Sequence, residues 1–260
     1  MNNRMDYAFL DKQYNFMTKE HPQSVLLASL ADLLDEEKAK RLIQAVMLII
    51  RADKPDIAAY HMSSWFGMVC SAVQASLSLY DTVLLLSPDR LKLQIIMVEG
   101  RRKVSFVLRD AVSADMSIET SGASRSEVLN SFYEQTVRPI MGGLALASLT
   151  KENQLWAQFA TRLYNEKDIL LQKASLLPER RPVIEQDFAI LLNELNVEKL
   201  GLKRNPFDLE FHWIEHMQHP DELIRQKVAC CLAYKTDTSH GYCYTCPRLS
   251  VEGRQAKREA

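Results

Sequence analysis

The sequence predicts an α+β fold that is mostly helical, with a small antiparallel β-sheet in the middle and a C-terminal helix and loop that carry cysteines. Glycine is scarce, at 8 of 260 residues, which is typical of helix-rich proteins. Segments with helical apolar spacing stand on both sides of a central run of short, β-branched segments. The regular alternation of strand and helix that a parallel sheet requires is absent.

Three helices are predicted before the sheet. Residues 24–34 and 38–50 repeat apolar residues at helical spacing. Residues 56–80 form a third, long helix, and the stretch 61–80 carries no charge and is long enough to cross a bilayer. That stretch also contains a histidine, a glutamine and several serines, so we expect a buried helix and no transmembrane segment.

The sheet is predicted from residues 82–86, 91–98 and 104–108, which are rich in aliphatic and β-branched side chains. The last two segments read as a hairpin that turns around Gly100. Residues 115–119 are a candidate for a further strand.

Helices are predicted again after the sheet. Ser124 and Glu127 form a capping-box pattern at a helix start, and Pro139 breaks or kinks the run that follows. Two more helices are predicted over residues 152–164 and 182–201.

The chain divides into an α+β region, residues 1–205, and a C-terminal cysteine-bearing segment, residues 206–250. Residues 251–260 are strongly charged and are expected to form a disordered tail. The N-terminus has no apolar run with a cleavage site, so we expect a cytoplasmic, reducing compartment. A net charge of −1 argues against nucleic acid or an anionic membrane as partner.

Four of the five cysteines lie within seventeen positions near the C-terminus: Cys230, Cys231, Cys243 and Cys246. Disulfides do not persist in a reducing compartment, whereas thiolates bind zinc and iron–sulfur clusters there. The pattern therefore favours a metal centre.

A helix is predicted over residues 219–234, because a proline and two acidic residues follow His219. Neighbouring residues on a helix point about 100° apart, so Cys230 and Cys231 suit a two-iron cluster better than one tetrahedral zinc ion. Lys227 would lie on the same face, where it either offsets the charge of the cluster or is simply solvated. On spacing alone an iron–sulfur cluster is favoured, with structural zinc or a redox or structural thiol cluster as alternatives.

Residues 225–234 and 243–247 resemble the C-terminal signature of the FhuF-type ferric-siderophore reductases, which end in Cys-Cys, a ten-residue spacer and Cys-x-x-Cys. The Asn-Pro pair at 205–206 and the Ser-Trp-Phe stretch at 64–66 are similar to other elements of that family. The spacer here, residues 232–242, has eleven residues. A loop tolerates this departure, because loop closure depends only weakly on length.

The resemblance implies that all four C-terminal cysteines ligate a [2Fe–2S] cluster. It also implies a ferric-siderophore reductase, which passes one electron to the Fe(III) of an imported siderophore so that Fe(II) is released. Hard oxygen donors hold Fe(III) far more tightly than Fe(II), so the transfer frees the metal. The chain has no Gly-x-Gly-x-x-Gly motif, so we expect an external electron donor such as a ferredoxin, a flavodoxin or a separate NAD(P)H-dependent reductase.

Six cationic or aromatic residues are candidates for binding the siderophore: Arg101, Arg102, Lys103, Arg138, Trp65 and Trp213. The cations near the hairpin turn would meet an anionic siderophore, or they form only a solvated turn. The tryptophans would flank a ligand or fill the core. A rival interpretation is a siderophore- or partner-binding module whose four cysteines hold structural zinc, and a third is a thiol redox sensor.

Overall fold

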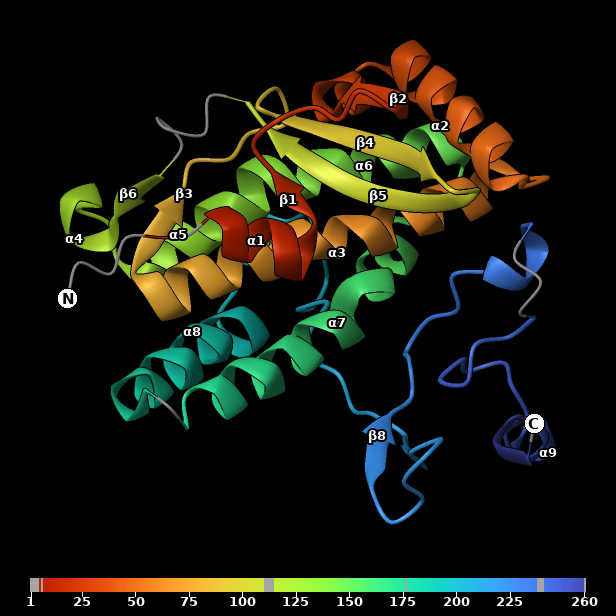
Figure 1. Ribbon diagram of the computed structural model, residues 1–260. Helices are drawn as coiled ribbons and strands as arrows, with labels where there is room; N and C mark the ends of the chain where they lie inside the picture. The colour runs from red at the N-terminus through yellow and green to blue at the C-terminus, as the bar shows by residue number, and fades with distance from the viewer. Residues whose placement is uncertain (1–4, 6, 110–114, 176, 238–240, 260) are drawn as a thin grey trace.

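A computed structural model describes residues 5, 7–109, 115–175, 177–237 and 241–259 (Figure 1). The helices are α1 (Tyr7–Tyr14), α2 (Glu36–Ile50), α3 (Pro55–Tyr80), α4 (Ile118–Ser121), α5 (Arg125–Phe132), α6 (Arg138–Ser148), α7 (Glu152–Lys173), α8 (Arg181–Asn193) and α9 (Val251–Glu259). The strands are β1 (Phe16–Met17), β2 (Ser24–Ser29), β3 (Thr82–Leu84), β4 (Leu91–Val98), β5 (Arg101–Leu108), β6 (Asp115–Ser117), β7 (Trp213–Glu215) and β8 (Leu223–Arg225). The predicted α+β class, mostly helical with a small sheet, is confirmed.

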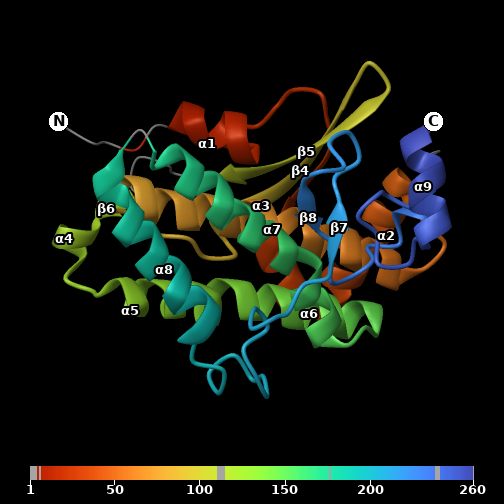
Figure 2. The ribbon, with the colours of Figure 1, turned by 90° about the horizontal axis from the view of Figure 1, so that it is seen from below.

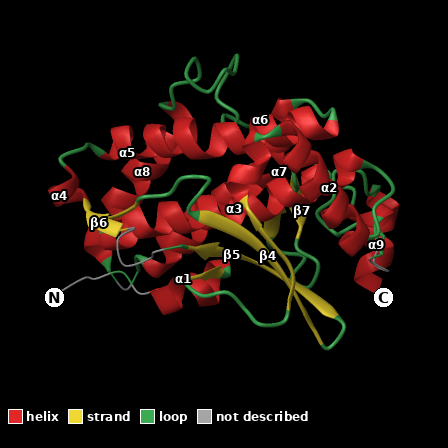
Figure 3. Ribbon diagram, turned by 90° about the horizontal axis from the view of Figure 1, so that it is seen from above, coloured by secondary structure: helices red, strands yellow, loops and turns green. Residues whose placement is uncertain are grey.

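Helix α3 is the centre of the fold. It packs against α2, α6, α7 and α8, and the sheet lies along its other side (Figures 2 and 3). Phe66 of α3 meets Phe106 of β5 edge to face, with ring centroids 5.8 Å apart. Gly67 lets α7 approach closely, because a Cβ at this position would lie 2.5 Å from the Cβ of Phe159. Burial of apolar surface on both sides of α3 is therefore what holds the layers together.

Two buried serines of α3 are accommodated by hydrogen bonds to neighbouring helices. Ser63 donates to the carbonyl oxygen of Leu155 over 2.6 Å, and Ser78 donates to a carboxylate oxygen of Asp187 over 2.8 Å. The prediction of a buried helix over residues 56–80 is thus confirmed. Across the described ranges we find no helix with the length and apolar character needed to cross a bilayer.

The main sheet has the strand order β1-β5-β4-β2. β4 and β5 form the predicted antiparallel hairpin, in which Leu93 is opposite Phe106. The turn consists of Glu99 and Gly100, both with positive φ, as in the two-residue turns that match strand twist. β1 joins β5 in parallel, so the sheet is mixed, and the predicted strand at 115–119 pairs as β6 with β3 outside it.

Residues 24–34 do not form the helix that the sequence predicted. They form β2, which pairs antiparallel with β4, followed by a 3-10 turn over Leu30–Leu34 that Ser29 caps. The apolar spacing fits both structures, and pairing with an otherwise open edge of the sheet decides for the strand.

The later helices follow the prediction with shifted ends. The capping box of Ser124 and Glu127 is present. A π-helical turn over Tyr133–Val137 joins α5 to α6, so Pro139 lies in the first turn of α6 and the run continues. α7 extends past the predicted end at 164, and α8 ends earlier than predicted.

The predicted helix over residues 219–234 is wrong. β7 and β8 form a short hairpin there, closed by a hydrogen bond from the His216 N–H to the Glu222 carbonyl over 2.8 Å. The chain then runs without regular structure to a 3-10 turn at Ala233–Lys235. The charged tail, expected to be disordered, instead forms α9 over 251–259.

Candidate metal centre and adjoining cavity

Two of the four predicted metal ligands are already in contact. The Sγ atoms of Cys230 and Cys246 lie 3.5 Å apart, although sixteen positions separate them in the sequence. Each sulfur also accepts a backbone N–H at 3.4 Å, Cys230 from Leu232 and Cys246 from Arg248. Such N–H···S bonds stabilise thiolates and tune metal–thiolate centres.

Local backbone geometry places these sulfurs. The Cys246 N–H donates to the Cys243 carbonyl over 3.0 Å, which closes the Cys-x-x-Cys stretch into a tight turn. Leu232 has a left-handed conformation with φ 57°, which turns the chain back so that its N–H faces the Cys230 sulfur. The Lys227 N–H donates to the Thr245 carbonyl over 3.0 Å and ties the two cysteine-bearing stretches together.

The four C-terminal thiols differ in exposure. Cys246 is buried, Cys230 and Cys231 are half-buried, and Cys243 is exposed. Burial raises the pKa of the Cys246 thiol from 9.0 to about 11, and the neighbouring thiols of Cys230 and Cys243 add to the shift. Cys230, Cys243 and Cys246 therefore share one electrostatic neighbourhood.

The donor set fits a soft or borderline metal centre: four thiols in one short segment, two in contact, with N–H groups directed at both of these sulfurs. Within the described part of the chain, no three His, Cys, Asp or Glu side chains are already arranged to hold a metal ion.

Helix α9 fastens the cysteine turn. The guanidinium of Arg254 is buried and donates to the carbonyl oxygens of Cys246 and Leu249, each over 2.8 Å. Arg258 forms an ion pair with Glu215 of β7, whose carbonyl also accepts the Tyr244 hydroxyl over 2.8 Å. The tail is ordered because these contacts tie it to the cysteine turn and to the β7–β8 hairpin.

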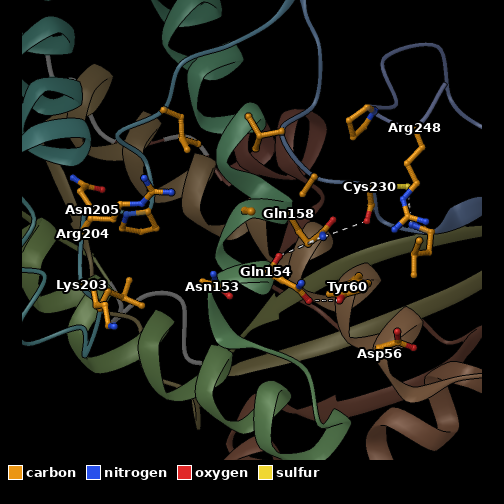
Figure 4. Close-up of a pocket in the computed structure, with 18 of the residues that line it drawn as sticks. Asp56, Tyr60, Asn153, Gln154, Gln158, Lys203, Arg204, Asn205, Cys230 and Arg248 are labelled. Carbon is orange, nitrogen blue, oxygen red and sulfur yellow. Dashed lines mark hydrogen bonds between the residues drawn. The ribbon is translucent and has the colours of Figure 1, made fainter. Parts of the chain in front are cut away.

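A large cavity adjoins the cysteines. Its volume is about 1080 Å³, and it lies between the first turns of α3 and α7, the loop at 201–209 and the cysteine segment. Cys230 is part of its wall, and Gln158 of α7 donates to the Cys230 carbonyl over 3.4 Å (Figure 4). Tyr60 of α3 donates to Gln154 of α7 over 2.6 Å in the same wall.

The siderophore-binding candidates taken from the sequence do not line this cavity. Arg102 donates to the Ile49 carbonyl over 2.8 Å and pairs with Asp237 at 2.6 Å. Arg101 and Lys103 lie beside it on β5 near the hairpin turn. Their neighbours in β4 are Val98 and Ile96, so these two cations lie on the sheet, and neither lines the cavity.

The other three candidates are also placed elsewhere. Arg138 of α6 lies against Gly201 and lines a smaller cavity of about 380 Å³. Trp65 is half-buried against the core and meets His61 edge to face. Trp213 is exposed on β7, with the guanidinium of Arg225 4.9 Å above its ring.

The position predicted for Lys227 depended on a helix that is absent. Its charge acts instead on His61 of α3. Burial, together with the positive charges of Arg102 and Lys227, lowers the pKa of His61 to about 4. Lys227 is therefore close enough to α3 for its charge to oppose protonation of His61.

Four cavity-lining cations were missed by the sequence analysis: Lys203, Arg204, Lys235 and Arg248. The sequence holds a partial signal. Lys203 and Arg204 directly precede the Asn205-Pro206 pair that carries part of the family resemblance, and this pair also lines the cavity.

Comparison with models of protein families finds none that matches the chain, and comparison with curated proteins finds no significant similarity. The family resemblance of the cysteine segment therefore stays a prediction.

Proposed function

We propose that the protein is a cytoplasmic iron–sulfur ferric-siderophore reductase. The observation that carries the proposal is the position of Cys230. Its sulfur contacts that of Cys246, and the same residue forms part of the wall of a cavity of about 1080 Å³. A metal centre on these thiols would be in direct reach of a molecule in the cavity.

In this proposal Cys230, Cys231, Cys243 and Cys246 hold a [2Fe–2S] cluster, which supplies one electron when it is bound and reduced. The Fe(III) of the siderophore gains that electron and leaves as Fe(II). A ferredoxin, a flavodoxin or a separate NAD(P)H-dependent reductase then supplies the replacement electron.

The residues of the chain have separate tasks. The N–H groups of Leu232 and Arg248 donate to the sulfurs of Cys230 and Cys246, as backbone N–H groups do around metal–thiolate centres. Gln158 holds the Cys230 carbonyl and so fixes this residue against α7. A ferric complex bound in the cavity would lie beside Cys230, so that the electron would cross a short distance.

The rival function, a binding module with a structural zinc site made of the four cysteines, is favoured by one observation. Among the described residues after Phe207, only Leu232, Cys246 and Arg254 are buried, so the segment has almost no apolar core. Small segments of this kind often depend on structural zinc. The two proposals differ in colour and in the ability to transfer an electron.

A single-turnover experiment tests the reductase. Protein reduced with dithionite and freed of excess reductant is mixed anaerobically with a ferric siderophore, and Fe(II) is trapped with a ferrous-specific chelator. We expect close to one Fe(II) per loaded chain and none from Cys230→Ser. The matched control is Cys70→Ala, which removes a buried thiol of α3 and should keep the full yield.

Two results would contradict the proposal. A colourless protein that contains zinc and yields no Fe(II) would support the binding module in place of the reductase. Turnover with NADPH alone would show that the protein needs no external electron-donor protein.

A further inference from the structure

The cavity beside Cys230 carries an excess of positive charge. Its charged lining residues are Lys203, Arg204, Lys235, Arg248 and Asp56. In the described residues, no carboxylate forms an ion pair with any of the four cations. Lys235 lies over the ring of Tyr234, and Arg248 donates to the Tyr234 hydroxyl over 3.1 Å. The charges of these side chains are thus available to a ligand.

Two helix N-termini add to this charge. Asp56 of α3 and Asn153 of α7 lie in the first turns of helices of 26 and 22 residues, and both line the cavity. The residues that precede these helices, Lys54 and Lys151, give no side-chain cap. The positive ends of both helix dipoles thus lie at the cavity, where Asp56 and Glu152 in the same first turns offset part of their charge, so the four cations supply most of the positive field.

The cations stand on opposite sides. Figure 4 shows Lys203 and Arg204 on one side and Cys230 with Arg248 on the other, while Gln154 and Gln158 lie between them. A ligand that bridged the cavity would meet cations at both ends and amide groups in the middle. Guanidinium groups bind carboxylates through two parallel hydrogen bonds.

We propose that the cavity binds a ferric chelate with net negative charge and free or metal-bound carboxylates, with Lys203 and Arg204 holding the end far from Cys230. This rests on the proposed function and names its substrate class. The cavity volume of about 1080 Å³ is slightly above the usual range for small-molecule sites, about 300–1,000 Å³, and suits a bulky chelate. Neutral tris-hydroxamate complexes would leave the cations without a partner.

The test uses gallium(III), which resembles Fe(III) in charge and size and is not reduced under these conditions. Calorimetric titrations compare a citrate-centred bis-hydroxamate gallium complex, which is anionic, with a neutral tris-hydroxamate gallium complex. We expect the anionic complex to bind at least about tenfold more tightly, with an affinity that falls as salt is added. Metal-free citrate should bind at least about tenfold more weakly than the anionic complex.

The double variant Lys203→Gln/Arg204→Gln should lose about tenfold in affinity for the anionic complex and nothing for the neutral one. The matched control is Lys38→Gln/Arg41→Gln, which removes the same charge from the exposed face of α2 and should leave both affinities unchanged. A melting curve confirms that each variant is folded.

Equal or tighter binding of the neutral complex would overturn the charge preference. So would equal binding of metal-free citrate, or unchanged affinity in the Lys203/Arg204 variant. Reduction of a ferric tris-hydroxamate by the metal-loaded protein distinguishes failure of the proposed substrate class from failure of the reductase function. If that reduction proceeds while the gallium results fail, the substrate class is wrong and the reductase function stands.

Discussion

Helix α3 and the C-terminal segment, residues 208–259, are held by different forces. Nineteen of the 26 residues of α3 are buried, and its neighbours pack on all sides. In the C-terminal segment, Leu232, Cys246 and Arg254 are the buried residues among those described. Hydrogen bonds to backbone groups and ion pairs hold this segment together and against α7.

The difference separates folding from function. The region around α3 has enough apolar burial to fold without a cofactor. The cysteine segment lacks it, so we expect a bound metal centre to supply much of its local stability. The cavity lies where the two regions meet, and each region provides part of its wall.

Removal of the metal should have the largest effect and would act on one region only. In metal-free protein, backbone amides of residues 226–237 and 241–250 should lose hydrogen-exchange protection by about a hundredfold or more. Amides of α3 and α7 should keep theirs. Equal loss in both regions would show that the core also depends on the metal, which would contradict the proposed difference between the two regions.

Two neighbouring glycines of α6 test the packing of the helical region. A Cβ at Gly143 would lie 1.9 Å from the carbonyl oxygen of Leu33, so Gly143→Ala should destabilise the fold by about 3 kcal/mol or more. Gly142 has no atom within 4 Å of the same position, so Gly142→Ala should stabilise it by about 0.5–1 kcal/mol. Urea unfolding measures both, and metal content should stay constant in each folded variant. Equal effects at the two positions would contradict the packing argument.

His61 lies at the contact between the two regions and should make stability depend on pH. Its pKa falls from 6.5 to about 4, because burial and the charges of Arg102 and Lys227 oppose protonation. The folded state thus keeps His61 neutral, and its contribution is present above pH 6.5 and is lost as the pH falls towards 4.

Between pH 7.5 and 4.5 the wild type should lose about 2 kcal/mol more unfolding free energy than His61→Gln. Urea unfolding at both pH values gives the difference. Parallel losses in the two proteins would mean that His61 titrates normally.

Replacement of Arg254 should have the smallest effect and tests the role of α9 in holding the cysteine turn. Arg254→Gln removes the hydrogen bonds to the carbonyls of Cys246 and Leu249, at a local cost of about 1–2 kcal/mol. We expect a chelator to remove the metal about tenfold faster, with the melting temperature of the helical region unchanged. Gln255→Ala, an exposed change on the same helix, is the control and should not alter the rate.

The sequence predicted the elements whose structure is decided locally. The long apolar run of α3, the hairpin at Gly100 and the capping box of Ser124 were all found. The predictions for residues 24–34 and 219–234 were wrong because their apolar spacing and turn residues fit two structures. Pairing with the distant β4 decides for a strand in the first case, and pairing with β7 across a short hairpin decides for one in the second. Proline and acidic residues after His219 are as typical of a turn as of a helix start.

The candidate site was predictable only in part, because local sequence decides some of it and the fold decides the rest. The cysteines are close in sequence, and Cys230 and Cys246 do meet. The cavity is built from α3, α7, the loop at 201–209 and the cysteine segment, so no local pattern could assemble it. The predicted binders Arg102 and Trp213 have other partners, Asp237 and Arg225, that only the fold brings near.

The most direct test of the central claim is a visible absorption and electron paramagnetic resonance spectrum of anaerobically purified protein, before and after dithionite. We expect absorption between about 320 and 600 nm that bleaches on reduction, together with the rhombic signal of a reduced [2Fe–2S] centre. A colourless protein with one zinc per chain and no signal after reduction would contradict the reductase proposal and leave a zinc-stabilised binding module.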